Sequence, residues 1–167
     1  MLDLLPEICD QHANDIKILS PAFRNFGGKS TFYGEVVTLK AFEDNSKLRE
    51  LVAQSGAGKV IVVDAAGSLQ CAMLGDMLAE KAAANGWQGI IINGCVRDVN
   101  ALSQINLGVQ ALAAHPLKTD KRGVGDINVL INMGGVDIKP GDFVYADGNG
   151  VVVSEQQLDL VKLGWKA

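Results

Sequence analysis

The sequence is poor in the residues on which several common catalytic sites depend. It contains only two histidines, His12 and His115, in unrelated contexts. This scarcity excludes the H-E-x-x-H metal motif and argues against a Ser-His-Asp triad. No G-x-x-x-x-G-K-[ST] phosphate loop occurs, and the Gly56-Ala57-Gly58 segment precedes its strand, opposite to the order in a dinucleotide-binding fingerprint. We therefore expect chemistry that rests on carboxylates, arginine and backbone groups.

Cysteines, basic residues and long apolar runs are also scarce. The three cysteines, Cys9, Cys71 and Cys95, are odd in number and lack C-x-x-C spacing, which argues against a disulfide framework. The net charge of −4 argues against a nucleic-acid partner, which normally requires a basic stripe. No apolar run approaches the ~20 residues that span a bilayer, and residues 1–7 lack the features of a signal peptide. The expected location is a reducing cytoplasm, with no nucleic-acid or membrane partner.

The order of elements indicates an α/β domain. The chain has 167 residues and shows no internal repeat, low-complexity tract or linker, which predicts a single domain over residues 1–167. Helices are predicted over residues 1–12, 46–54, 71–85 and 99–105. Strands are predicted over residues 33–42, 59–64, 89–93, 109–113, 127–131, 136–138, 143–146 and 151–153. Alternating strands and helices followed by a β-rich end predict a layered, partly mixed sheet, whose strand order remains open.

The first candidate site segment is Leu74-Gly75-Asp76-Met77-Leu78, which follows the predicted strand ending at Asp64 and lies near a helix start. Unpaired backbone N–H groups at such a position can bind a carboxylate. Glycine permits the close approach of a ligand, and Asp76 adds a carboxylate of its own. The alternative is that Asp76 only caps the helix.

The second candidate is Gly94-Cys95-Val96-Arg97-Asp98, at the carboxyl end of the predicted strand 89–93. Ligands in α/β sheets gather beyond the carboxyl ends of strands. Arg97 can bind a substrate carboxylate through two parallel hydrogen bonds. Asp98 can hold Mg²⁺ or Mn²⁺, hard ions that prefer oxygen ligands and retain several waters. The alternative is an Arg97–Asp98 pair that only fixes the strand end to the next helix.

Taken together, the two segments suit one class of substrate. A 2-oxo acid needs a carboxylate nest, a cation for its carboxylate and a Lewis acid for its developing enolate. A Schiff-base mechanism would instead need a desolvated lysine, and no lysine lies in either segment. The pair of segments therefore favours metal-dependent chemistry on a small 2-oxo acid.

At these residues the sequence resembles the family of class II 4-hydroxy-4-methyl-2-oxoglutarate/4-carboxy-4-hydroxy-2-oxoadipate aldolases, which also contains the regulator of ribonuclease activity A. The shared spacing is an Asp, twenty intervening residues and then Arg-Asp, here Asp76, residues 77–96 and Arg97-Asp98. The resemblance covers nearly the whole chain. Its other segments are Phe26-Gly27-Gly28, Val62-Val63-Asp64, Gly86-Trp87-Gln88-Gly89, Gly141-Asp142, Tyr145-Ala146-Asp147 and Gly150-Val151-Val152-Val153.

The resemblance implies a fold, an assembly and an activity. The fold would be a compact β/β/α domain similar to phosphohistidine swivelling domains, assembled into homotrimers or hexamers with active sites at subunit interfaces. The activity would be metal-dependent retro-aldol cleavage to pyruvate, with decarboxylation of oxaloacetate. By this resemblance the backbone amides of Gly75, Asp76, Met77 and Leu78 would bind the pyruvyl carboxylate. Arg97 would contact the substrate and stabilise its enolate, Asp98 would coordinate the metal, and Asp76 would hold a metal-bound water.

The same family offers an alternative function. Members that inhibit ribonuclease E often lack the Gly-Asp and Arg-Asp pairs, whereas this chain retains both. The alternative is a protein that binds and regulates a ribonuclease through its acidic surface, with a vestigial site.

Overall fold

The computed structural model describes residues 2–166. The helices in this range are α1 (Leu4–His12), α2 (Ser46–Val52), α3 (Asp76–Ala84) and α4 (Val99–Leu102). The first six strands are β1 (Ile16–Ile18), β2 (Arg24–Asn25), β3 (Phe32–Lys40), β4 (Lys59–Asp64), β5 (Ala72–Leu74) and β6 (Gly89–Val96). The remaining strands are β7 (Gly108–Ala114), β8 (Asp126–Ile127), β9 (Ile131–Met133), β10 (Val136–Ile138), β11 (Phe143–Asp147) and β12 (Gly150–Ser154). In the described range no helix has the length and apolar character that crossing a membrane requires.

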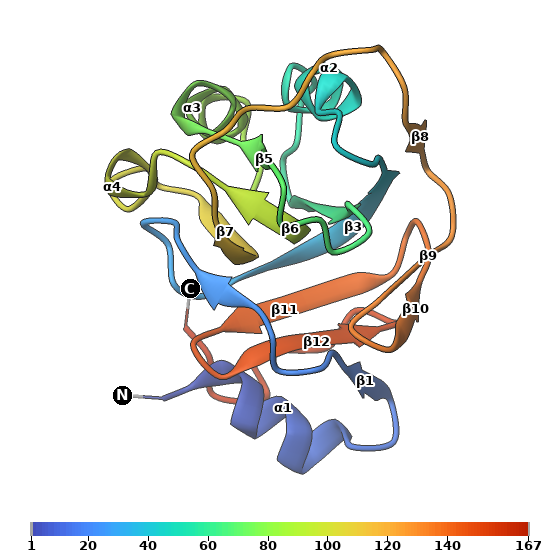
Figure 1. Cartoon of the computed structure of the whole chain (residues 1–167). Coiled ribbons are helices and arrows are strands. Elements are labelled where there is room, and N and C mark those ends of the chain that lie inside the picture. Colours follow the sequence, from blue (N-terminus) through green and yellow to red (C-terminus); the bar gives the residue numbers. More distant parts are fainter. Residues whose placement is uncertain (1, 167) are drawn as a thin grey trace.

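One large mixed sheet organises the chain. Its main strand order is β1-β12-β11-β3-β4-β6-β7-β2, with β5 paired to β6 and β8 paired to β3. Strands β3, β4, β6 and β7 are parallel, so their carboxyl ends lie at one edge. Strand β11 pairs antiparallel with β3, which joins the parallel part to the β-rich C-terminal part of the chain (Figure 1). Strands β9 and β10 form a separate hairpin.

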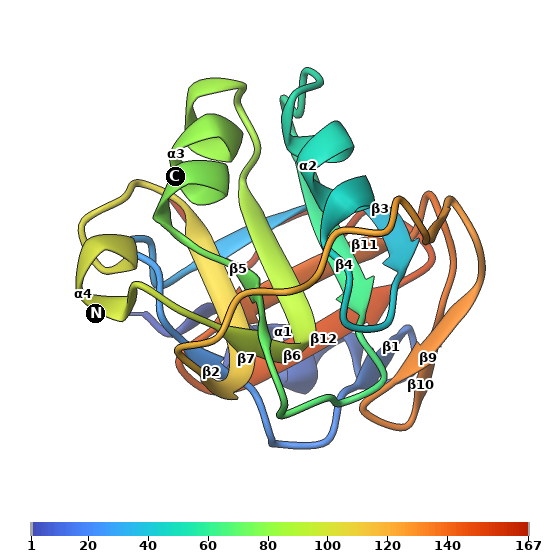
Figure 2. The ribbon, with the colours of Figure 1, turned by 45° about the horizontal axis from the view of Figure 1, so that its top comes forward.

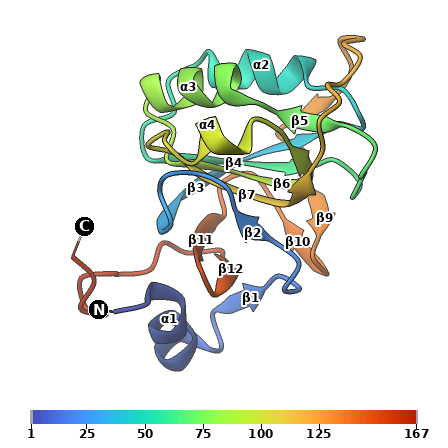
Figure 3. The same cartoon turned by 60° about the vertical axis from the view of Figure 1, so that its left-hand side comes forward.

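The chain is arranged in layers (Figure 3). Helices α2, α3 and α4 cover one face of the parallel strands, and β9 to β12 lie beneath the other face. One buried cluster fills the helix–sheet interface, and a second fills the space between the parallel strands and the C-terminal strands. Helix α1 packs on β11 and β12 through a third cluster. The layered α/β domain with a mixed sheet, predicted from the sequence patterns, is therefore confirmed, and the layering agrees with the β/β/α fold that the resemblance implied. A likeness to swivelling domains stays a prediction.

The central strands were predicted well because both of their faces are buried. Strand β4 has the predicted bounds 59–64, and its four central residues are inaccessible to solvent. Such continuous β-branched runs are typical of parallel strands covered on both sides. The helices predicted over 1–12, 46–54 and 99–105 are present but shorter, and Met1 lies outside the described residues.

Two predicted elements were wrong in part. Residues 71–85 were predicted as one helix, but residues 72–74 form β5 beside β6 and the helix begins only at Asp76. Pairing with β6 outweighs the weak helix preference of the Ala-Met-Leu segment. Residues 127–131 were predicted as one strand, but Asn128 has a positive φ of 60° and separates β8 from β9.

A buried carboxylate ties a long connection to the start of α2. Asp44 is fully buried and accepts hydrogen bonds from the Ser46 N–H and hydroxyl and from the backbone N–H groups of Arg122 and Val124. Burial alone would raise the pKa of Asp44, but these hydrogen bonds outweigh it and hold the pKa well below its usual range. The connection from β7 to β8 runs past β5 before it reaches this anchor (Figure 2). Asp44 therefore fixes the segment that crosses the carboxyl edge of the sheet.

We predict that Asp44→Asn lowers the free energy of unfolding by about 1–3 kcal/mol at neutral pH, because buried N–H donors lose a charged acceptor. The pKa of Asp44 is lower in the folded chain, so its stabilisation is complete above the unfolded value of about 3.9 and is lost as the pH falls below it. Urea unfolding across this pH range measures the effect, with the exposed Asp10→Asn as control. A difference from wild type that does not shrink in acid would contradict this role.

Candidate functional site

The two candidate segments lie side by side at the carboxyl edge of the sheet. Leu74 is the register partner of Val96, so β5 brings its last residue beside the end of β6. The backbone N–H of Arg97 donates to the Leu74 carbonyl at 2.9 Å. The sequence placed the first segment after the strand ending at Asp64, but the strand that positions it is β5.

A direct hydrogen bond connects the segments. The backbone N–H of Asp76 donates to Oδ2 of Asp98 at 3.0 Å. Asp98 has a φ of 57°, a left-handed conformation that aspartate and asparagine tolerate better than most residues. This conformation stands between the end of β6 and the first turn of α4. The Asp98 carboxylate is thereby held at the start of α3, where a negative charge is favoured by the helix dipole.

Gly75 leaves the space in which this contact forms. A Cβ atom at position 75 would lie 2.5 Å from Oδ2 of Asp98 and 3.5 Å from Cγ and Nε of Arg97. Only the end of the Asp98 side chain would clash, whereas the Arg97 atoms would be in ordinary van der Waals contact. The glycine is therefore required for the position of the Asp98 carboxylate rather than for the fold.

Arg97 lies next to the carboxylate without being neutralised by it. Its Nε is 4.0 Å from Oδ2 of Asp98, and both side chains are more than one-third exposed. An exposed pair at this distance contributes little to stability. The alternative that Arg97 and Asp98 act only as a structural pair is thus poorly supported, and the guanidinium remains available to a bound anion.

The first turn of α3 presents further donors. The first hydrogen bond within this turn runs from the Ala79 N–H to the Gly75 carbonyl at 3.2 Å, so the amides of Asp76, Met77 and Leu78 have no intrahelical partner. Asp98 uses the first of them. The structure therefore brings together all the predicted site residues, but their individual roles stay predictions.

The donor set suits a hard divalent cation that keeps much of its water. Among residues 2–166, no group of three or more His, Cys, Asp or Glu side chains is placed to hold a metal ion. Asp98 and Asp76 supply oxygen atoms only, and Mg²⁺ typically binds through one or two carboxylates together with water and substrate. These oxygen donors are of the kind that Mg²⁺ or Mn²⁺ accepts, and coordination of a metal by Asp98 stays a prediction.

Neighbouring residues show what the sequence missed. His115 directly follows β7, and its N–H donates to the Val96 carbonyl at 2.9 Å beside Arg97. Sequence patterns leave the strand order open, so they gave no signal that His115 lies beside the end of β6. Cys95 is buried, and burial raises the pKa of its thiol.

The site itself is open to solvent. Three cavities of about 1110, 690 and 640 Å³ occur elsewhere in the chain, and neither segment lines any of them. Met77, which follows Asp76, is 79% exposed, and Val99, which follows Asp98, is 37% exposed.

Known proteins resemble this chain over nearly its whole length. A family model described as "RraA-like: Aldolase/RraA" matches residues 5–153. A Pseudomonas aeruginosa (strain LESB58) protein named "Putative 4-hydroxy-4-methyl-2-oxoglutarate aldolase" is 58% identical over 155 residues, which cover 93% of this chain and 96% of that protein. A protein of the same name from Hahella chejuensis is 59% identical over 155 residues, 93% of this chain and 94% of that protein. A solved structure described as the RNA-processing inhibitor RraA from Thermus thermophilis has a TM-score of 0.91 and 37% identity, covering 95% of this chain and 96% of that one.

We predict that Gly75→Ala disrupts the site while changing the free energy of unfolding by less than about 1 kcal/mol, because side-chain ends can shift where packed backbone cannot. The added methyl group should displace the Asp98 carboxylate and free the Asp76 amide. Amide hydrogen exchange should then show a faster rate at Asp76. Gly148→Ala is the matched control, since a Cβ there meets nothing within 4 Å. Unchanged protection of the Asp76 amide in Gly75→Ala would refute the proposed role of this glycine.

Proposed function

The chain belongs to the Aldolase/RraA family, and from that premise we propose that it is a divalent-metal-dependent aldolase that releases pyruvate. Its substrates would be 4-hydroxy-4-methyl-2-oxoglutarate and related acids. The observation that carries the proposal is the hydrogen bond between the Asp76 amide and the Asp98 carboxylate, which joins two segments beside Arg97. The names of the close relatives support the same activity.

The reaction requires an anion to be stabilised at a fixed place. In the retro-aldol direction the 4-hydroxyl group loses its proton, the C3–C4 bond breaks, and C4 becomes the carbonyl carbon of a second 2-oxo acid. The electron pair of the broken bond passes to C3, giving the enolate of pyruvate, and protonation of C3 completes the product. Oxaloacetate would give the same enolate by losing CO₂, so one site would serve both reactions.

The residues of the site match these demands. The free amides at the start of α3, those of Met77 and Leu78, would bind the carboxylate of the pyruvyl unit. The Arg97 guanidinium would bind the substrate and stabilise the negative charge as it develops. Asp98 would hold the cation, and Asp76 would orient a water on it. The chemistry that a divalent cation supplies when bound is Lewis-acid polarisation of the 2-oxo group.

The openness of the site supports assembly around it. Met77 and Val99, the residues that follow Asp76 and Asp98, expose apolar surface. A neighbouring subunit of a homotrimer or hexamer would cover that surface and exclude water from the reacting atoms. We therefore include a homo-oligomer in the proposal.

We predict that Arg97→Ala lowers kcat/KM for pyruvate release by on the order of 100- to 1000-fold, because a preorganised donor to the developing charge is lost. A coupled assay of pyruvate release from oxaloacetate, 4-hydroxy-4-methyl-2-oxoglutarate and 4-carboxy-4-hydroxy-2-oxoadipate measures this loss. Arg49→Ala on α2 is the matched control, since Arg49 is exposed and far from the two segments in sequence. Exhaustive chelation should abolish the activity, and Mg²⁺ or Mn²⁺ should restore it. Near-normal turnover by Arg97→Ala, or full activity after chelation, would contradict the proposed mechanism.

A second candidate function is regulation of a ribonuclease. The supporting observation is the close structural similarity to a protein described as an RNA-processing inhibitor, together with the net charge of −4. In this case the acidic surface would bind the ribonuclease, and the Asp98 site would be dispensable.

We predict that, if the regulatory role holds, the purified chain slows RNA cleavage by ribonuclease E and Asp98→Asn inhibits as strongly as wild type. A cleavage assay with both proteins, alongside the pyruvate assay, separates the two functions. Inhibition without pyruvate release would favour regulation alone. No inhibition at a large molar excess of the chain, and no capture of the ribonuclease on the immobilised protein, would count decisively against it.

A further inference from the structure

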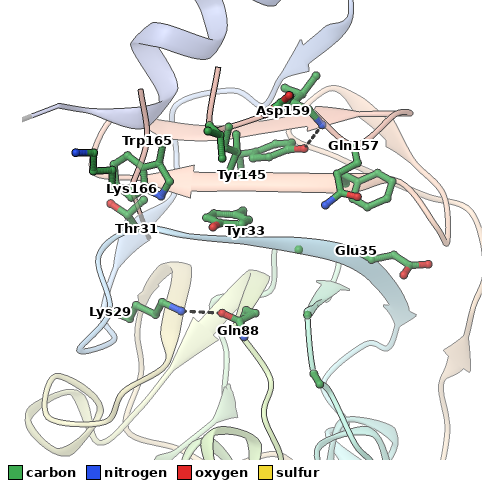
Figure 4. A pocket seen from close by; sticks show the side chains of 17 residues that line it. Lys29, Thr31, Tyr33, Glu35, Gln88, Tyr145, Gln157, Asp159, Trp165 and Lys166 are labelled. Atoms are coloured by element: carbon green, nitrogen blue, oxygen red, sulfur yellow. Dashed lines mark hydrogen bonds between the residues drawn. The ribbon is translucent and has the colours of Figure 1, made fainter. Parts of the chain in front are cut away.

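A second site lies at the opposite end of β6 from Arg97. A cavity of about 1110 Å³ is formed by the segment before β3, the first residues of β3, the Ala57-Gly58 turn and the C-terminal residues 157–166 (Figure 4). Gln88 lines this cavity and directly precedes β6, whereas Arg97 directly follows it. A strand of eight residues spans roughly 26 Å. The cavity is therefore separate from the proposed aldolase site.

Aromatic rings form much of its wall. Tyr33 of β3 and Tyr145 of β11 are stacked, with ring centroids 6.1 Å apart and an interplanar angle of 23°. Phe143 and Trp165 also line the cavity. The Tyr145 hydroxyl accepts a hydrogen bond from the Leu158 N–H at 2.8 Å, which fixes the C-terminal segment over the rings. Flat apolar walls of this kind favour a planar aromatic ligand.

Two lysines line the cavity, Lys29 and Lys166, and Lys29 is the one beside Gln88. The Lys29 ammonium donates to Oε1 of Gln88 at 2.8 Å, and none of the ion pairs within residues 2–166 includes Lys29. Burial lowers the pKa of Lys29, which reflects the cost of holding a charge away from water. In Figure 4 the Lys29 and Gln88 side chains point toward each other below β3, whereas Tyr33, Tyr145 and Trp165 lie above it and Glu35 lies apart. This end of the cavity therefore suits an anion.

We propose that this cavity binds an aromatic carboxylate, with its ring between Tyr33 and Trp165 and its carboxylate on the Lys29 ammonium. The volume lies slightly above the roughly 300–1000 Å³ of drug-sized ligand sites. The lining combines aromatic and aliphatic side chains with polar ones, among them Lys29 and Gln88. The ligand differs from the aliphatic 2-oxo acids of the aldolase proposal. The inference does not depend on that proposal, because binding requires neither metal nor turnover.

The test compares ligands that share a ring but differ in charge. Binding of 1-naphthoate and of neutral naphthalene-1-methanol to the full-length chain is measured by calorimetry and by tryptophan fluorescence. Trp165 reports on the cavity, whereas Trp87 is buried elsewhere with its indole N–H bonded to the Gln54 carbonyl. We expect one naphthoate per chain, bound at least on the order of 10-fold more tightly than the alcohol, since a hydrogen bond to a charged group distinguishes them.

Two variants assign the contacts. Lys29→Gln should remove the preference for the anion while leaving binding of the alcohol unchanged, and Trp165→Leu should weaken both ligands. Lys81→Gln on α3 is the control for loss of one positive charge and should behave as wild type. Equal affinity for the two ligands in wild type, or a preference that survives Lys29→Gln, would overturn the proposal. A change of oligomeric state in Trp165→Leu, seen by sedimentation, would also overturn it by making the cavity a subunit contact.

Discussion

The position of β6 between β4 and β7 is the constraint on which the rest of the chain depends. Parallel bonding on both edges fixes the register of this strand, and its two faces pack into different layers, Ile90 and Ile92 toward the helices and Ile91 toward the C-terminal strands. Every other feature is placed relative to it. Arg97 and Asp98 directly follow its carboxyl end, and its last two residues, Cys95 and Val96, pair with β5. Its amino end positions Gln88 beside the aromatic cavity.

The candidate site forms where two short connections meet under that constraint. Strand β5 has only three residues, yet it aligns the start of α3 with the end of β6 closely enough for the Asp76 amide to reach the Asp98 carboxylate. Neither residue adds much to the stability of the fold, since both lie at the surface and the Arg97–Asp98 pair is partly hydrated. The arrangement requires a left-handed backbone at Asp98 and a glycine at position 75, and it fills no part of the core. Unfavourable local conformations of this kind are more typical of functional sites than of residues that stabilise the fold.

Sequence patterns predicted the parts of the chain whose local preference agrees with the fold. The β-branched run of β4 was predicted with the bounds that the structure has. The meeting of the Gly75-Asp76 and Arg97-Asp98 segments was also predicted, although the first segment was placed after β4 and not after β5. Strand β5 was missed because its Ala-Met-Leu sequence favours a helix, and only its contact with β6 makes it extended. The aromatic cavity was missed for a related reason. Its residues come from five separate segments, and strand order, which local patterns do not encode, brings them together.

The left-handed conformation of Asp98 bears on how this family diversifies. Besides glycine and aspartate, asparagine adopts this conformation at little cost. Its side-chain oxygen can accept the same hydrogen bond from the backbone N–H of residue 76. An Asp-to-Asn exchange, reachable by one nucleotide change, would therefore erase the negative charge while preserving the shape of both connections. Such an exchange would remove the metal ligand of the proposed mechanism in a single step while the fold is retained. Proteins named as aldolases and as RNA-processing inhibitors can thus share one fold, because the change between them at this position requires no large loss of folding stability.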